Sequence, residues 1–192
     1  MILDPSQRGR LLPLPVVLIS TVDRSGVRNI APYGNVMPIL RPLDLIAFAS
    51  WFRRDTLENI RATEEFVINI PSIDLVDAVM ICSKNYPKDV DEFEEAKLTV
   101  RESEKVKAPS IAECIGWMEC VLEKEVVEEG KYAIIIGKVV YLEVDDQYLT
   151  ADGAIDLEKA RPLSMMLGKD GMQYTYPRQI GEERRYAEMS IR

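Results

Sequence analysis

A basic pair and a hydroxyl group stand together where a helix is expected to begin. The segment 52–59 is FRRDTLEN, and Asp55 with an acidic residue three positions later has the spacing of a helix capping box. The first turn of a helix presents unpaired N–H groups and the positive end of its dipole, so Arg53, Arg54 and Thr56 could hold a phosphate group there. A pair of solvated arginines beside a capped helix would give the same residues.

A second segment could accept a flat aromatic ring. Residues 29–35 are NIAPYGN, with small residues, a proline and two amide side chains where an ordinary strand would carry alternating β-branched residues. Pro32 and Gly34 interrupt regular sheet hydrogen bonding, so main-chain N–H and C=O groups stay available for the polar edge of a heterocycle. An edge strand with a bulge would show the same composition.

The chain contains no histidine, which removes several kinds of active site. Ser-His-Asp and Cys-His catalysis, and the common zinc and iron sites that use histidine, cannot be built from its own residues. A bound cofactor must therefore supply any demanding chemistry.

The three cysteines, Cys82, Cys114 and Cys120, are odd in number and match no close-paired spacing. We expect them to be buried, reduced thiols rather than a disulfide framework, a zinc site or redox groups.

An acidic cluster and two tryptophans suggest sites of their own. The run 89–95 is DVDEFEE, but it lacks the spacing and the glycine of a calcium loop, so we interpret it as a solvated helix face rather than a cation site. No metal site is expected. We assign Trp117 to the core, and Trp51 could either cover a bound ring or fill the core.

Length and charge limit the partners. The 192 residues suit a single domain over 1–192, and the net charge of -8 argues against nucleic acid, which needs a surplus of Lys and Arg on one face. No apolar run of about 18 residues and no leader-like N-terminus is present, so we expect a soluble, cytoplasmic protein without membrane contact.

Short β-rich runs separated by turns dominate the chain. We expect strands at Val16–Val22, Arg28–Pro38, Asp44–Ser50, Phe66–Ile70, Ile115–Glu129, Lys131–Asp145 and Met172–Tyr176. Helices are expected from Asp55 to near Glu65, from Ser72 to Met80, and over Asp89–Lys97. Gly137, inside the second long strand, predicts a bulge or a close backbone approach. Without a β-α-β rhythm or a phosphate-binding glycine motif, the pattern predicts an antiparallel barrel with helical insertions.

The order of several motifs resembles one known family. VVLISTVDRSGVRNIAPYG followed by RRDTLENIRATEEFVINI is similar to the FMN-binding split-barrel family of flavin reductases and flavoredoxins. The stretches NYPKDVDEFEEAKLT, KVKAPSIAE, IGWMEC, IIIGKVVYLEV and DGAIDLEKARPL then follow in the order of the flavoredoxin-like branch. The resemblance covers nearly the whole chain and implies a mainly β, antiparallel split barrel of Greek-key type.

The resemblance also implies which residues bind FMN. The isoalloxazine and ribityl portions would lie along Asn29, Ala31, Pro32, Tyr33, Gly34 and Asn35, and the same wall would continue through Ala49 and Ser50. The phosphate would be held by Arg53, Arg54 and Thr56, with Asn59 orienting the loop. Because such proteins place the flavin near a homodimer interface, Ser83, Lys84 and Asn85 would contact it from either subunit.

One departure from the family bears on the electron donor. Members that oxidise NAD(P)H often carry a histidine five residues before the glycine of the I-I-G-x-V strand, and this chain has Tyr132 there. A phenol cannot become an imidazolium near neutral pH. Three functions therefore stay open. The first is a flavin reductase whose FMN takes hydride from NAD(P)H, and the second is an electron carrier whose FMN is reduced by a redox protein. The third is an interaction protein that keeps the barrel without a cofactor.

Overall fold

A seven-stranded antiparallel sheet forms the body of the protein. The computed structural model describes residues 2–179, so Met1 and residues 180–192 lie outside the described part. The strand order is β3-β2-β6-β9-β10-β5-β4. The strands are β2 Val17–Val22, β3 Arg28–Tyr33, β4 Met37–Pro38, β5 Leu45–Trp51, β6 Glu65–Ile70, β9 Gly116–Glu128 and β10 Tyr132–Val144.

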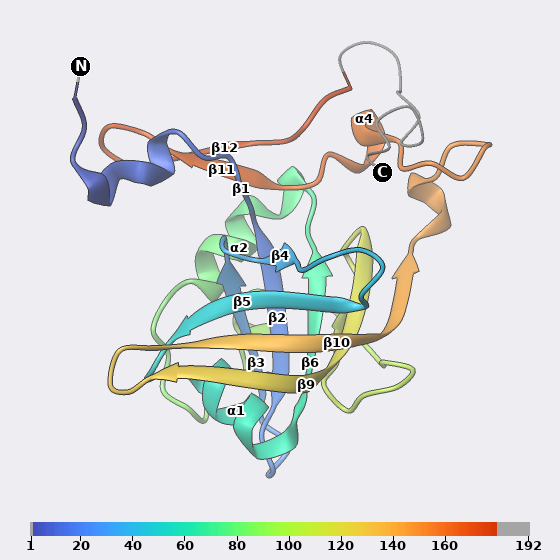
Figure 1. The fold of residues 1–192 in the computed structure, drawn as a ribbon. Coiled ribbons are helices and arrows are strands. Elements are labelled where there is room, and N and C mark those ends of the chain that lie inside the picture. The colour runs from blue at the N-terminus through green and yellow to red at the C-terminus, as the bar shows by residue number, and fades with distance from the viewer. Residues whose placement is uncertain (1, 180–192) are drawn as a thin grey trace.

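The sheet curls strongly but does not close. In Figure 1 the long hairpin of β9 and β10, with β5, crosses the direction of β2, β3 and β6, which gives a split barrel open between β3 and β4. All neighbouring strands of this sheet pair antiparallel. The expected mainly β, antiparallel split barrel with helical insertions is confirmed.

Both faces of β2 are covered by apolar side chains. Leu18 packs in one cluster with Ile30, Phe93 and Trp117, which confirms the core position of that tryptophan. The next residue, Ile19, packs in a second cluster on the opposite side of the strand. Successive side chains of a strand point to opposite faces, so a strand buried on both sides needs a continuous apolar run. This explains the unbroken VVLI sequence at its start.

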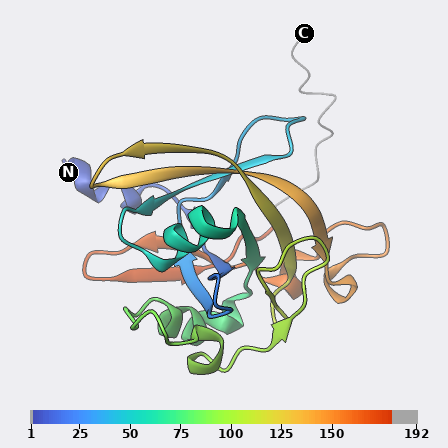
Figure 2. The ribbon, with the colours of Figure 1, turned by 90° about the horizontal axis from the view of Figure 1, so that it is seen from below.

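Short helices occupy the connections of the sheet. They are α1 Asp55–Thr63, α2 Val76–Cys82, α3 Glu92–Glu95 and α4 Leu157–Ala160, with 3-10 turns at Pro5–Arg10, Ile73–Leu75 and Asp146–Tyr148. Figure 2 shows the green helices α2 and α3 beside the blue strands, and both pack against β3. This packing places the residues after α2 next to the expected ring-binding segment.

A second, three-stranded sheet joins the two ends of the described chain. Its order is β1-β11-β12, with β1 Leu14–Pro15, β11 Ser164–Leu167 and β12 Met172–Thr175. Leu14 lies opposite Met165 although the two are distant in sequence. Only the β12 segment was expected from the sequence, because the pairing of β1 with β11 leaves no local signal. In Figure 1 this small sheet lies across one end of the main sheet.

Two of the expected elements are wrong in detail. The single strand expected over Arg28–Pro38 is two strands, because β3 ends at Tyr33 and β4 pairs with β5 instead of β2. The main chain turns at Gly34, where a Cβ atom would lie 2.7 Å from the Met165 side chain. The helix expected over Asp89–Lys97 is only the single turn Glu92–Glu95. The helix expected to end near Glu65 does so, at Thr63, because Glu64 adopts a left-handed conformation with φ of 60°.

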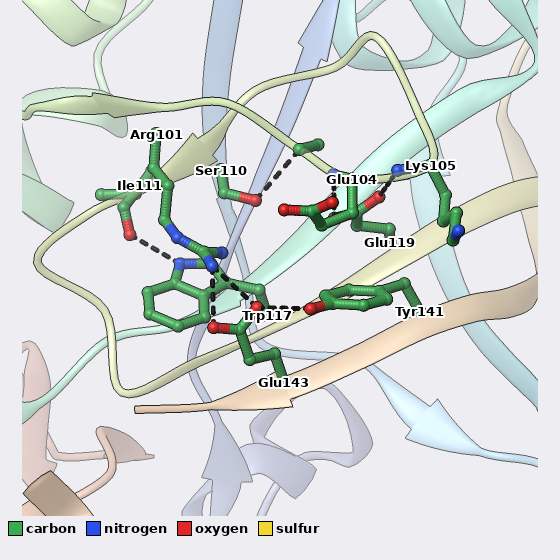
Figure 3. A network of polar contacts seen from close by, with 10 residues as sticks. Arg101, Glu104, Lys105, Ser110, Ile111, Trp117, Glu119, Tyr141 and Glu143 are labelled. Carbon is green, nitrogen blue, oxygen red and sulfur yellow. Dashed lines mark hydrogen bonds and ion pairs between the residues drawn. The ribbon is translucent and has the colours of Figure 1, made fainter. Parts of the chain in front are cut away.

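A short hairpin and the loop within it are fastened to the long strands by polar contacts (Figure 3). The hairpin consists of β7 Val100–Arg101 and β8 Ser110–Ile111. The Arg101 guanidinium lies 4.0 Å from the Trp117 ring centroid and donates to the Glu143 carboxylate at 2.7 Å. The buried Glu119 carboxylate accepts backbone N–H groups of the loop residues Glu104, Lys105 and Val106. These contacts close one side of the core.

Gly137 is expected to be intolerant of a side chain. The register of β10 against β9 shifts between Ile136 and Gly137, and a Cβ atom at Gly137 would lie 2.4 Å from the buried Phe66 ring. Overpacking of a dense core costs about 1–3 kcal/mol, so Gly137→Ala should lower the free energy of unfolding in a urea titration by about that amount. The control is Gly171→Ala, where a Cβ atom would meet nothing within 4 Å. Equal stability of both variants would contradict the close approach.

Candidate functional site

A cavity of about 650 Å³ lies between the main sheet, α2 and the small second sheet. Its volume is within the range of small-molecule sites, roughly 300–1,000 Å³. The residues expected to bind a cofactor line it, except Ser50 and Asn59. The expected residues in the lining are Asn29, Ala31, Pro32, Tyr33, Gly34, Asn35, Ala49, Arg53, Arg54, Thr56, Ser83, Lys84 and Asn85. Segments that are distant in the sequence, such as 29–35 and 83–85, therefore meet around one cavity.

One wall of the cavity is the outer edge of β3 and the turn after it. β3 is an edge strand, so the sheet leaves the main-chain groups along its outer side without strand partners. Asn35 Nδ2 donates to the Ala49 carbonyl at 2.9 Å and holds the turn against the end of β5. The result is a narrow surface of small side chains and main-chain atoms.

Ser50 supports this wall from behind. It is 2% exposed, and its Oγ lies 3.1 Å from the Tyr33 hydroxyl. Tyr33 also packs edge-on against Phe48, with 4.9 Å between the ring centroids. Burial raises the pKa of the Tyr33 phenol, so the hydroxyl stays protonated and can donate as well as accept a hydrogen bond.

The N-terminus of α1 opens at the other end of the cavity. The N-cap residue is Arg54, whose side chain makes no capping hydrogen bond, and Asp55 is already the first helical residue. The expected capping box is therefore wrong, because the acidic side chain sits one position too late to accept the first-turn N–H groups. Those N–H groups keep their capacity to bind an anion.

Three cationic side chains at this end lack acidic partners. Among residues 2–179, neither Arg53, Arg54 nor Lys84 forms an ion pair, and Arg54 Nη1 donates instead to the neutral Asn85 Oδ1. Elsewhere the arginines near carboxylates are paired, as Arg61 is with Glu125. The acidic residues Asp55, Glu58 and Glu92 also line the cavity, so its charges balance, but the three unpaired cations keep donors available for a bound anion.

A buried network of polar side chains lies beneath the Thr56 side of the cavity. Thr56 Oγ1 donates to Asn29 Oδ1 at 3.0 Å, and Asn29 Nδ2 donates to Glu92 Oε1 at 2.9 Å. Asn59, which does not line the cavity, donates to Thr21 Oγ1 at 3.0 Å, and Thr21 Oγ1 is 3.4 Å from Asn29 Oδ1. Asn59 therefore stabilises the network without lining the cavity.

The interpretation of the acidic run as a solvated helix face is wrong for Glu92. This residue is 6% exposed, because α3 packs its Phe93 side into the core and turns the neighbouring carboxylate toward β3. Asp91 caps α3 by accepting from the backbone N–H of Phe93 at 2.9 Å. The sequence predicted a helix in this region, but it did not indicate that a strand covers Glu92.

Other lining residues come from elements that the sequence did not connect with the site. Besides the acidic Asp55, Glu58 and Glu92, most are apolar or aromatic and belong mainly to α2 and the second sheet: Val16, Ile30, Trp51, Val79, Met80, Cys82, Tyr86, Met165, Met172 and Tyr174. Trp51 is 69% exposed and lines the cavity, so it does not fill the core. Tyr132 lies directly opposite Trp51 in the pairing of β10 with β5.

The three cysteines are free and buried, as expected. Burial raises the pKa of the Cys82 thiol to about 12, with the charge of Glu92 adding to the effect, and burial also raises the pKa values of Cys114 and Cys120. All three are therefore neutral thiols and weak nucleophiles near pH 7. Within the described residues, no group of acidic or cysteine side chains has the arrangement of a metal site.

The helices in the described part of the chain are too short or too polar to cross a bilayer.

Comparisons with known proteins agree on one family. The model of the flavin reductase like domain matches residues 9–163. An uncharacterised protein of Methanothermobacter thermautotrophicus is 49% identical, over 98% of this chain and 91% of its own length. Nitrilotriacetate monooxygenase component B from Bacillus cereus is similar in structure, with a TM-score of 0.82, 28% identity, and coverage of 95% of this chain and 98% of the other.

A second solved structure has the same fold at lower identity. Flavoredoxin of Desulfovibrio vulgaris (Miyazaki F) superimposes with a TM-score of 0.84 at 23% identity, covering 98% of this chain and all of the other.

Proposed function

The chain belongs to the flavin reductase like family, and on that premise we propose that it binds FMN in the cavity and transfers electrons or hydride through it. A bound flavin supplies the redox chemistry that a chain without histidine lacks. The protein's part is to hold the cofactor, orient it and keep its polar groups paired.

The observation that carries the proposal is the anion site at one end of the cavity. Arg53, Arg54 and Lys84 lack acidic partners among the described residues and surround the uncapped start of α1. A terminal phosphate carries close to two negative charges and several acceptor oxygens, which these donors match. A single phosphate at the far end of the ligand favours FMN over riboflavin.

The wall formed by β3 suits the ring of the cofactor. Its small side chains, with the main-chain atoms from Ala31 to Asn35, leave a narrow surface on which a flat heterocycle can lie. Tyr33 and Asn35 are held in place by Ser50 and by the Ala49 carbonyl. These contacts keep the wall rigid, and no side-chain acid or base is needed in it.

The source of electrons divides the proposal into two candidates. A flavin reductase would take hydride from NAD(P)H bound over the ring, within reach of the exposed Trp51. A carrier would receive electrons from a redox protein; Tyr132 beside Trp51 and the acidic surface favour it. We also propose a homodimer, since the β4–β5 connection exposes Met37, Leu40 and Leu43.

A direct test uses the purified protein. We expect a visible flavin absorption spectrum, or uptake of added FMN with a loss of its fluorescence. Bleaching within turnover time after anaerobic addition of NADH or NADPH would identify a reductase, and an inert spectrum that bleaches with a reduced redox protein would identify a carrier. A colourless protein that takes up no flavin would disprove the proposal and favour a cofactor-free interaction protein.

A further inference from the structure

The phosphate site leaves one buried group unexplained, the carboxyl group of Glu92. It lines the cavity, is 6% exposed and forms no ion pair within the described residues. Its oxygens accept from Asn29 Nδ2 at 2.9 Å and from the backbone N–H of Ile30 at 3.3 Å. A carboxylate in this position adds negative charge to a cavity that is to receive a phosphate.

The directions of the hydrogen bonds around Glu92 also disfavour a bound phosphate. An ionised carboxylate only accepts, so Asn29 must turn its NH₂ group to Glu92 and its Oδ1 atom to Thr56. The one hydroxyl hydrogen of Thr56 is then used by Asn29 Oδ1 at 3.0 Å. With Glu92 ionised, Thr56 can donate to a phosphate oxygen only by giving up its hydrogen bond to Asn29 Oδ1, which would leave that oxygen with the longer 3.4 Å contact from Thr21.

We propose that Glu92 is a positioning residue for the phosphate of the cofactor: it takes up a proton from solvent when the phosphate binds, which reverses the Asn29 amide and frees the Thr56 hydroxyl to donate into the cavity. The inference rests on the proposed FMN site. The proton goes to Glu92 Oε1, whose O–H donates to Asn29 Oδ1, and Asn29 Nδ2 then donates to Thr56 Oγ1. One negative charge is removed and one donor is gained.

The surroundings of Glu92 favour the proton. Burial raises the pKa of Glu92 and the charge of Asp55 adds to this, while the hydrogen bonds from Ile30 and Asn29 oppose it. Acidic groups outnumber basic ones around it, since Arg28 of β3 is bound to Asp91 and Lys88 to Glu58. The facing groups are Arg28 on β3, Asp23 and Lys88 on loops, Asp55 on α1, Cys82 on α2, and Asp91, Glu94 and Glu95 on or beside α3.

The test compares FMN with riboflavin, which lacks the phosphate, for the wild-type protein and Glu92→Gln. A glutamine can accept from Ile30 and donate to Asn29 Oδ1, as a protonated Glu92 would. Near pH 8 we expect the variant to bind FMN about tenfold more tightly than the wild type, which corresponds to a shift of about one pKa unit on binding. The difference should shrink as the pH falls, since the wild-type Glu92 then becomes protonated as well, and riboflavin should not distinguish the proteins.

A second measurement counts protons. Calorimetric titration near pH 7 in two buffers of different ionisation enthalpy gives the protons exchanged on binding. A phosphate entering a basic site by itself releases protons, since its second pKa is about 6, so the exchange is compared between the wild type and Glu92→Gln, which share this contribution. We expect the wild type to take up more protons with FMN than the variant does, and neither protein to exchange protons with riboflavin.

The outcomes separate this inference from the proposed function. Tight FMN binding with the same proton exchange in the wild type and Glu92→Gln, or with the same pH dependence in both proteins, would overturn the role of Glu92 and leave the FMN site intact. Failure of the wild type to bind either flavin would overturn the proposed function itself.

Discussion

Replacement of both Arg53 and Arg54 by alanine is expected to weaken FMN binding by about three orders of magnitude. Hydrogen bonds to charged groups contribute about 1.5–3 kcal/mol each, and every 1.4 kcal/mol is about a factor of ten in Kd. Both side chains are exposed at the cavity and lack acidic partners in the described part of the chain, so their removal leaves no buried charge behind. Fluorescence titration with FMN measures the loss.

The matched control for this pair removes two arginines that do not line the cavity. Arg24→Ala with Arg61→Ala changes the net charge by the same amount, and Arg61 lies on the same helix as the proposed phosphate site. We expect its FMN affinity to change by less than about threefold, mostly through screened long-range attraction. Riboflavin affinity should be nearly equal in all three proteins. An equal loss of FMN and riboflavin affinity in the cavity variant would show that the arginines shape the pocket rather than bind a phosphate.

The second large effect is expected on stability, from Glu119→Ala. The Glu119 carboxylate is fully buried and accepts three backbone N–H groups of the 104–106 loop, the closest at 2.6 Å. Alanine would leave these donors without acceptors beside an empty space. Leaving a buried hydrogen-bond donor without its acceptor costs about 1–3 kcal/mol, and an emptied core position adds to this, so urea unfolding should show a decrease of about 3 kcal/mol.

Two further variants define the origin of that loss. Glu123→Ala removes an exposed acid from the same strand and should change the free energy of unfolding by less than about 0.5 kcal/mol. Glu119→Gln keeps one acceptor oxygen and should lie between the two. If Glu119→Ala were as stable as Glu123→Ala, the loop contacts would have no net effect on folding.

Much of the scaffold follows from local patterns. Local signals include the continuous apolar run of β2, the two long β-rich runs around Gly130, and the caps Ser72 of the 3-10 turn before α2 and Asp91 of α3. Each acts over a few neighbouring residues. Side-chain alternation, turn conformations and capping are properties of short segments, so the sequence alone determined most strands and helices. It also grouped most of the expected cofactor residues into two short segments, 29–35 and 53–59, with the others at 49–50 and 83–85.

Only the tertiary structure decided which other groups meet those segments. Glu92 is buried because α3 packs against β3, which lies far earlier in the chain. There the Glu92 carboxylate accepts hydrogen bonds from Asn29, 63 positions away, and from Ile30, 62 positions away. Met165 and Tyr174 reach the cavity because β1 pairs with β11. Such contacts depend on how whole elements pack, and this packing is set by the summed burial of the two cores rather than by any residue's neighbours in sequence.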